Sequence, residues 1–202
     1  MNEITKAMWI PKEVKNTKIF QLIEHINSSK NLNIQSYKEL WKWSVDNISE
    51  FWEIFLKFSE IKCYGSYEKA VDETIPMENI PKWFEGCKLN YAENLLHRES
   101  QRPGIISESE SEVRVVLTHA EIYRETSKLF HQFQRFGLKE GDIIASVLPN
   151  DHRAVIAMLA CASLGCVWTS MPTELQAIGI IQKLSGIKPT ILLGTDLIVY
   201  AG

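Results

Sequence analysis

The chain has 202 residues, a formal net charge of −3 at pH 7, 45% hydrophobic residues and 23% charged residues. Such a chain can bury a sizeable core in one large domain or two small ones. The slightly acidic balance argues against nucleic acid or an anionic membrane as its main partner. The longest apolar run, Ala154 to Ala162, is too short to span a bilayer. Residues 1–13 lack the apolar region of a secretory signal.

Cysteine and histidine spacing gives no sign of a metal site or a disulfide framework. The four cysteines, at positions 63, 87, 161 and 166, include no CxxC pair. His119 and Glu121 have H-x-E spacing, but no cysteine follows at the spacing of a zinc site. We therefore expect reduced thiols and no metal, as in a cytosolic protein. Cys161 and Cys166 are expected to be inert, whereas Cys63 and Cys87 lie in a looser region.

Residues 1–80 have the pattern of helices. Apolar residues recur at helical spacing from Lys18 to Ile26, and the polar run from Asn27 to Asn31 is expected to break that helix. Ser36 and Glu39 form a capping box before the next helix. An aromatic stripe follows at helical spacing, which is typical of a packing surface: Ile48, Phe51, Trp52, Phe55 and Phe58. This part is predicted to be a helical cap on a larger body.

The segment from Trp83 to Leu96 ends in a predicted short helix that Asn90 can cap. It is expected to connect the cap to the next domain. An alternative is that Tyr91, Glu93 and Asn94 line a site. From Pro103 to Leu117 two apolar runs flank a Ser/Glu tract, which predicts a hairpin with a charged tip, although such a tract also resembles a phosphoacceptor site.

A second capping box, Thr118 with Glu121, opens a helix that Gly137 closes. Ile143 to Leu148 then form a short, almost unbroken apolar run, typical of a strand covered on both faces. Asn150 or Asp151 can cap the helix that follows, and Gly165 ends it before a strand opening at Cys166.

A third capping box, Thr173 with Gln176, is expected to open another helix, and Thr190 to Leu193 is the next predicted strand. Residues 141–194 therefore have a β-α-β-α-β pattern. This is the incomplete first half of a doubly wound, mostly parallel sheet, so the fold class is α/β.

These residues carry a resemblance to a known family. The order Thr118, Glu121, Gly137, Gly141-Asp142 and Pro149-Asn150 is similar to the start of the acyl-adenylate-forming, AMP-binding synthetases. Longer stretches resemble the acetoacetyl-CoA synthetase family in particular: MWIP at 8–11, SYKELWKWSV at 36–45, WFEGCKLNYAENLL at 83–96 and LPNDHRAVIAMLACASLGCVWTS at 148–170. The resemblance covers nearly the whole chain but only the N-terminal part of such an enzyme. It implies a cap and link over residues 1–100, like the N-terminus of acetyl-CoA synthetases, and the truncated start of an AMP-binding domain over residues 101–202.

The resemblance implies an acid–thiol ligase. Acetoacetate, Mg²⁺-ATP and coenzyme A give acetoacetyl-CoA, AMP and diphosphate through an acyl adenylate. Such an enzyme needs a Ser/Thr/Gly-rich loop to cradle the triphosphate, a carboxylate for the ribose and a lysine from a mobile lid. The sequence contains no such loop, and no lid fits in its length. No catalytic residue is therefore assigned, and the chain by itself is expected to be inactive.

One stretch departs from the family pattern. Where the family has an S-P-D-F-G type segment, this chain has PTELQ at 172–176. The resemblance makes Pro172, Thr173 and Glu174 candidates for the wall of the coenzyme A channel. Gln176 replaces a glycine, which removes a close backbone approach, and Tyr200 replaces an arginine that acts near the nucleotide phosphates in acetyl-CoA synthetases. Both changes predict that this chain by itself binds no cofactor productively.

Three interpretations remain. The chain is an N-terminal fragment of a cytosolic acetoacetate–CoA ligase, a fragment of a ligase for acetate or propionate, or a shortened, non-catalytic binding partner of a full-length synthetase. The first two imply a C-terminal half as partner, and the third implies a complete enzyme as partner.

Overall fold

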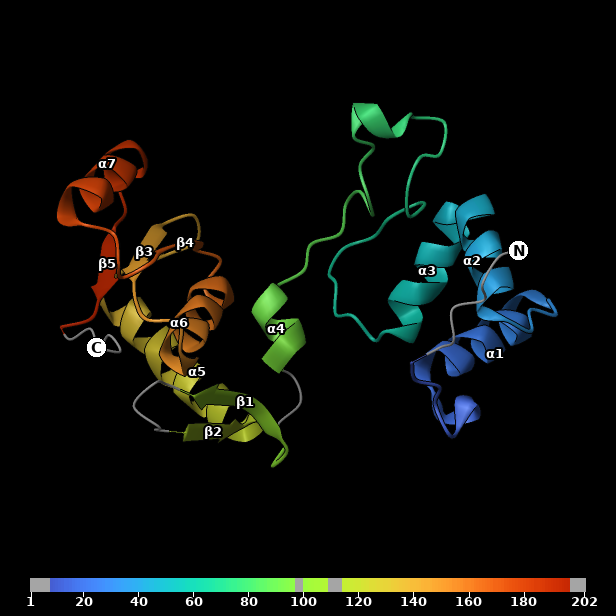
Figure 1. Ribbon diagram of the computed structural model, residues 1–202. Coiled ribbons are helices and arrows are strands. Elements are labelled where there is room, and N and C mark those ends of the chain that lie inside the picture. Colours follow the sequence, from blue (N-terminus) through green and yellow to red (C-terminus); the bar gives the residue numbers. More distant parts are fainter. Residues whose placement is uncertain (1–7, 97–99, 109–113, 197–202) are drawn as a thin grey trace, which may run out of the picture. The chain divides into compact units, whose positions relative to one another are not determined.

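The computed structural model describes residues 8–96, 100–108 and 114–196 (Figure 1). The chain divides into two compact units, Met1–Lys88 and Leu89–Gly202. The first unit contains η1 (Val14–Asn16), α1 (Lys18–Lys30), α2 (Tyr37–Asp46), α3 (Ile48–Phe58) and η2 (Met77–Asn79). The second unit contains α4 (Tyr91–Leu96), β1 (Pro103–Glu108), β2 (Arg114–Thr118), α5 (His119–Arg135), β3 (Ile143–Val147), α6 (His152–Ser163), β4 (Val167–Met171), α7 (Ala177–Ile187) and β5 (Ile191–Gly194).

The first unit is helical, as the sequence predicts. Its buried cluster takes residues from α1, α2 and α3 and from the connection between the first two helices: Leu22, Ile23, Ile26, Ile34, Leu40 and Ile54. Trp43 and three aromatic residues of the predicted stripe, Phe51, Phe55 and Phe58, pack against this cluster. The stripe therefore forms a packing surface, because helical spacing puts these rings on the side of α3 that meets the other helices.

The predicted helix break at Asn27 is wrong. Helix α1 continues to Lys30 and ends at Asn31, whose φ of 53° is left-handed. Asn27 is a residue of this helix. Its Nδ2 donates a hydrogen bond to the Ile34 carbonyl, and its Oδ1 accepts one from the Ile34 backbone N–H, both at 2.8 Å. Hydrogen bonds to the loop just after the helix thus hold a polar residue that by itself favours a turn.

After α3 the chain forms a long loop that returns to the same unit. Val71 bridges Trp83, Ala70 and Val71 are buried, and the Trp83 ring meets Trp52 of α3 edge to face. The Ser49 hydroxyl accepts a hydrogen bond from the backbone N–H of Val71. The loop is therefore packed on α3 by both apolar and polar contacts.

The second unit contains the α/β part of the fold, and the predicted class is confirmed. Strands β1 and β2 pair antiparallel, while the predicted tip at 109–113 lies outside the described residues. Strands β4, β3 and β5 form a parallel sheet in that order, with Ser146 of β3 beside Ser170 of β4 and Leu193 of β5. Strand β4 begins at Val167, one residue after the predicted Cys166.

Helices cover the sheet unequally. Helices α5 and α6 lie along one side of it and α7 lies on the other (Figure 1). Phe133, Ile144, Ala160 and Cys161 form the buried cluster on the α5 and α6 side, together with Leu138. Helix α7 has no buried residue. Its apolar side chains therefore contribute little to the core of this unit.

Local capping signals are confirmed at four helices and fail at one. Ser36 accepts a hydrogen bond from the backbone N–H of Glu39 at α2, and Asn90 accepts one from that of Glu93 at α4. Thr118 and Glu121 form the predicted capping box of α5, and the Asp151 carboxylate accepts a hydrogen bond from the backbone N–H of Arg153 at the start of α6. Helix α7 instead begins at Ala177, after Gln176, with no side-chain cap. The predicted box of Thr173 with Gln176 is therefore wrong.

Candidate functional site

The candidate site is a cavity at the carboxyl ends of β3 and β4. Ligands of open α/β sheets bind at this edge, because the loops that leave the strands diverge there. The cavity has a volume of about 310 Å³. Its lining comes from the ends of both strands, the loops that follow them and the first turn of α6: Ser146, Leu148, Pro149, Asn150, Ala154, Ser170, Met171, Pro172, Thr173 and Glu174.

The structure brings the three resemblance-based site residues together. Pro172, Thr173 and Glu174 all line this cavity, opposite the loop that follows β3. Glu174 is exposed and Thr173 is half-buried. Gln176, which replaces the family glycine, has extended backbone angles and leads into α7. Tyr200 lies outside the described residues.

Ser146 is the cavity residue that sequence reasoning missed. Its side chain is fully buried, and its hydroxyl has no hydrogen-bond partner among the described residues. Burying a hydroxyl without a partner is unfavourable by about 1–3 kcal/mol, so such a group marks a place where a ligand or water can bind. The sequence did contain a sign of this residue, because Ser146 is the one polar residue within the apolar run from Ile143 to Leu148.

The charge of the cavity determines which ligand groups it suits. Glu174 is the one charged residue of its lining, and the other polar groups are neutral hydroxyls and an amide. The nearest charged pair is already engaged, since Arg153 Nε donates to Asp151 at 2.9 Å. Burial acts to raise the pKa of Asp151, but the Arg153 hydrogen bonds lower it overall. The cavity therefore fits uncharged polar groups and not a triphosphate.

The other residues that the sequence singled out have structural roles. Glu121 Oε2 accepts from the backbone N–H and the hydroxyl of Thr118, both at 2.9 Å, and these bonds lower the pKa of its carboxyl. Within the described ranges, no group of three or more His, Cys, Asp or Glu side chains could hold a metal ion. Tyr91, Glu93 and Asn94 lie on α4 and do not line this cavity.

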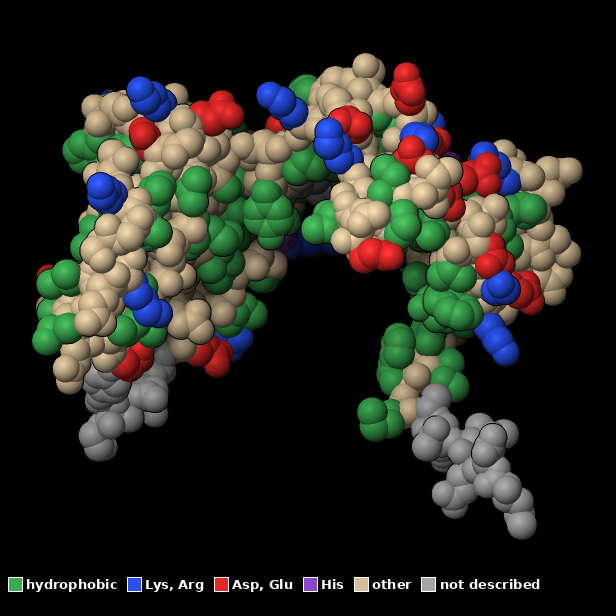
Figure 2. All heavy atoms as spheres, turned by 90° about the horizontal axis from the view of Figure 1, so that it is seen from above, with side chains coloured by type: hydrophobic (Ala, Val, Ile, Leu, Met, Phe, Trp, Pro, Cys, Tyr) green, Lys and Arg blue, Asp and Glu red, His purple; other side chains and the backbone are tan. Residues whose placement is uncertain are grey.

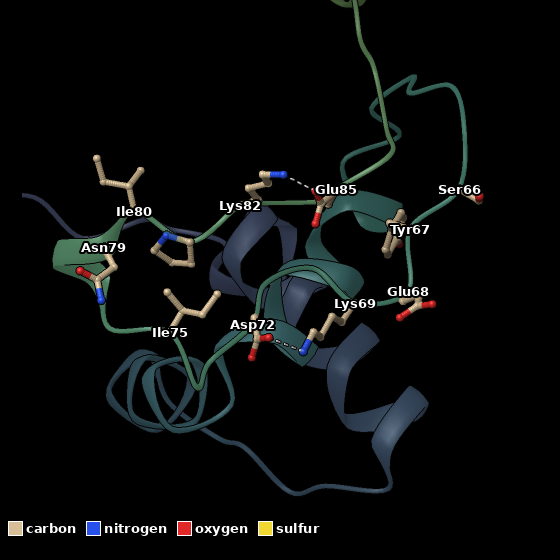
Figure 3. Close-up of a pocket in the computed structure, with 11 residues that line it drawn as sticks. Ser66, Tyr67, Glu68, Lys69, Asp72, Ile75, Asn79, Ile80, Lys82 and Glu85 are labelled. Atoms are coloured by element: carbon tan, nitrogen blue, oxygen red, sulfur yellow. Dashed lines mark hydrogen bonds and ion pairs between the residues drawn. The ribbon is translucent and has the colours of Figure 1, made fainter.

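Two further cavities lie elsewhere, each within one unit. The cavity in the first unit has about 870 Å³ and is lined by residues of the loop from Ser66 to Glu85 (Figure 3). The cavity between α5 and α6 has about 510 Å³ and includes the buried Nδ1 of His152, which lacks a partner in the described structure. Neither contains the residues that the resemblance singles out.

Comparison with known proteins identifies the family. The description "Acetyl-coenzyme A synthetase N-terminus" matches residues 37–95, and "AMP-binding enzyme" matches residues 96–198, which is more than half of the chain. The chain belongs to the AMP-binding enzyme family. Its parallel sheet and its two consecutive matches agree with the resemblance found in the sequence.

Acetoacetyl-CoA synthetases are the relatives that this AMP-binding chain resembles. It is 34% identical to the acetoacetyl-CoA synthetase of Danio rerio over 200 residues, which cover 98% of this chain and 30% of that protein. The enzyme of Macaca fascicularis is also 34% identical, over 199 residues. A solved acetoacetyl-CoA synthetase from Streptomyces lividans superposes with a TM-score of 0.79 and 26% identity, over 93% of this chain and 29% of that one.

This AMP-binding chain spans about 30% of the length of the curated relatives it matches. It also resembles a malonamoyl-CoA synthetase from Penicillium aethiopicum, at 27% identity over 203 residues. Relatives of this part thus differ in the acyl group that their names state, so likeness here does not specify the acid.

Proposed function

We propose that this chain is the N-terminal part of an acid–thiol ligase of the acetoacetyl-CoA synthetase type. In the complete enzyme, acetoacetate, ATP with Mg²⁺ and coenzyme A would give acetoacetyl-CoA, AMP and diphosphate. The support is the likeness to acetoacetyl-CoA synthetases over 98% of the chain. The cavity at the ends of β3 and β4 would form part of the wall along which coenzyme A, the source of the reacting thiol, lies.

The residues of the cavity suit this role. The Ser146 hydroxyl is buried and unpartnered in the described structure, and we propose that it becomes accessible on binding and hydrogen-bonds a neutral polar group such as an amide. Pro172 and Met171 offer apolar contact, and Glu174 would repel a phosphate. This combination favours the uncharged arm of coenzyme A over its phosphates.

The chain by itself would not activate a carboxylate. Its sequence has no Gly-rich phosphate loop, and the cavity lining has no cation. We therefore expect neither ATP–pyrophosphate exchange with acetoacetate nor thioester formation. Exchange above a heat-killed control, with any short carboxylic acid, would contradict the proposal that this is an inactive fragment.

Binding of the uncharged arm can be tested directly. Saturation-transfer NMR with pantetheine should show transfer from the folded chain to the ligand, and Thr173→Trp should abolish it by filling the cavity. Trp in place of the exposed Tyr37, on α2 of the other unit, is the matched control. No transfer from a folded chain, or equal transfer in Thr173→Trp, would refute the assignment of this cavity.

We further propose the domain limits expected from the sequence, with a cap and link over residues 1–100 and the start of the AMP-binding domain over residues 101–202. The compact units meet at Lys88 and Leu89, and the two family matches meet at residues 95 and 96. Helix α4 belongs to the second unit, where its buried Ala92 packs with Ile122 of α5 and Leu159 of α6. The link would therefore attach to the second unit through α4.

One structural observation favours further synthetase sequence as the cover of the exposed edge of the second unit. Ile178 and Ile181 of α7 are 68% and 65% exposed, and Leu192 of β5 is 51% exposed. Figure 2 shows hydrophobic side chains on the surface of this unit. We propose that a C-terminal half or a full-length synthetase covers this face. We also propose that the protein works in the cytosol on small-molecule substrates. Neither nucleic acid nor a membrane is proposed as a partner.

No helix of the described residues is long and apolar enough to cross a membrane.

Size-exclusion chromatography with thermal melting tests the proposal that further synthetase sequence covers the exposed face of α7 and β5. We expect self-association and a low melting temperature that rises when the partner half is added. A sharp monomer peak with cooperative melting well above about 50 °C would show a self-sufficient fold. That result would contradict cover by a missing C-terminal half and favour the third interpretation, a non-catalytic binding partner.

A further inference from the structure

The base of the loop that carries the cavity of about 870 Å³ is closed by paired backbone segments. Tyr64 and Lys88 form an antiparallel bridge with two hydrogen bonds, 2.7 Å from Tyr64 N to Lys88 O and 2.8 Å from Lys88 N to Tyr64 O. Gly65 and Gly86 follow and precede this bridge with φ of 105° and 96°. A Cβ on Gly65 would lie 2.3 Å from Gly86 O, so only glycine permits this approach.

The same bridge places two cysteines next to each other. Cys63 and Cys87 each precede a residue of the bridging pair, so in this antiparallel arrangement they are diagonal neighbours whose side chains lie on the same face. The two thiols are within hydrogen-bonding reach of one another, and both are free and partly exposed. Burial, then Glu53 and the two thiols, raise the pKa of Tyr67.

The residues that line the cavity lie inside the segment that these cysteines delimit. All eleven lining residues fall between Ser66 and Glu85 (Figure 3). Lys69 pairs with Asp72 at 3.0 Å, and Lys82 pairs with Glu85. The Tyr67 ring meets Phe84 edge to face at 5.0 Å. A covalent bond between Cys63 and Cys87 would therefore close the loop exactly where its two ends already meet.

We propose that Cys63 and Cys87 form a reversible disulfide that locks this loop and its cavity. The oxidant would be a small disulfide such as oxidised glutathione. The thiolate of one cysteine attacks a sulfur of the oxidant and expels one glutathione thiolate. The second cysteine thiolate then attacks the mixed disulfide and expels the second glutathione. Two protein thiols are oxidised and one small disulfide is reduced to two thiols.

The thiol environment sets the conditions of the test. Burial, and then the neighbouring Cys63, raise the pKa of the Cys87 thiol. Since the thiolate is the nucleophile, oxidation is slow at neutral pH. The intact chain should therefore be treated with oxidised glutathione at pH 8.5 and then examined by mass spectrometry under non-reducing conditions.

The expected product is a monomer that has lost two hydrogen atoms, with Cys63 and Cys87 in one cross-linked peptide. Trypsin cleavage after Lys69 or Lys82 should then leave fragments joined until dithiothreitol is added. Cleavage at both sites should be several-fold slower in the oxidised chain, because its loop opens less often. Dithiothreitol should restore the original rate.

Variants separate this proposal from non-specific oxidation. Cys87→Ser should yield one glutathione adduct on Cys63, and Cys63→Ser should yield one on Cys87. In both variants, trypsin should cleave after Lys69 and Lys82 at the same rate before and after oxidation. Cys161→Ser is the matched control and should behave as the parent chain. Two separate glutathione adducts on Cys63 and Cys87, a disulfide-linked dimer, or a bond to Cys166 would overturn the proposal. So would an oxidised chain whose loop is cleaved at the unchanged rate.

Discussion

Asn90 connects two helix ends, and its replacement gives a quantitative test of the second unit. Its Oδ1 accepts a hydrogen bond of 3.1 Å from the backbone N–H of Glu93, which caps α4. Its Nδ2 donates to the carbonyl of Ala162, near the end of α6, at 2.8 Å. The Ala162 carbonyl also accepts from the backbone N–H of Gly165, so it keeps a partner if Asn90 is removed.

The magnitude follows from these two contacts. Loss of an N-cap side chain destabilises by about 1 kcal/mol, and loss of a hydrogen bond whose acceptor keeps another donor by about 1 kcal/mol. Asn90→Ala should therefore lower the free energy of unfolding by about 2 kcal/mol. Asn90→Asp keeps the cap but loses the donor, so it should lower the free energy by about 1 kcal/mol. With a urea dependence of about 2 kcal/mol/M, the midpoints should fall by about 1 M and 0.5 M.

The assay needs a probe inside the second unit. Trp168 is the one tryptophan of residues 89–202, and it packs against the buried cluster of that unit. Fluorotryptophan labelling gives it a resolved ¹⁹F signal, which the Trp168→Phe variant assigns. Unfolding in urea is then followed at that signal. An Asn90→Ala midpoint equal to that of the parent would refute the argument, and equal midpoints for Asn90→Asp and the parent would show that the Ala162 contact contributes nothing.

Three other predictions concern packing, charge and thiol reactivity. Phe133 is 1% exposed, so Phe133→Ala should destabilise the second unit by about 3–5 kcal/mol in urea unfolding. Hydrogen bonds from Thr74 and then Lys69 lower the pKa of Asp72 from 3.8 to about 2. The stabilisation they give is present above pH 4 and lost between about pH 4 and 2, and NMR titration should show the pKa rising in Thr74→Val. Burial raises the pKa of Cys161 to about 12, so alkylation and peptide mapping of the folded chain should find it modified far more slowly than Cys63; equal rates would contradict its burial.

Local signals explain why much of the fold was predictable from the sequence. A capping side chain bonds to a backbone N–H two or three residues away, so Thr118, Asp151 and Asn90 act as predicted whatever surrounds them. The same holds for the alternation of apolar runs and helical stripes that predicts the parallel sheet. The resemblance supplied Pro172, Thr173 and Glu174, which the structure places along one cavity.

Where capping and breaking signals failed, a contact outside the predicted element prevailed. Asn27 favours a turn by composition, but its side chain bonds to Ile34 and the helix continues. Thr173 and Gln176 have capping-box spacing, yet the chain at Thr173 follows the edge of the sheet and lines the cavity, so α7 starts later. Sequence spacing cannot report such contacts, because it does not show which backbone groups a side chain meets once the chain has turned.

The sequence by itself determined the α/β class, the helical first unit, the caps of α4, α5 and α6 and the family resemblance, because each depends on residues that are neighbours along the chain. Only the tertiary structure decided that the Ser146 hydroxyl is buried without a partner among the described residues and that Cys63 meets Cys87 across 23 intervening residues. Burial and thiol proximity depend on how strands and loops pack against each other. That packing is set by the whole fold, not by any one segment.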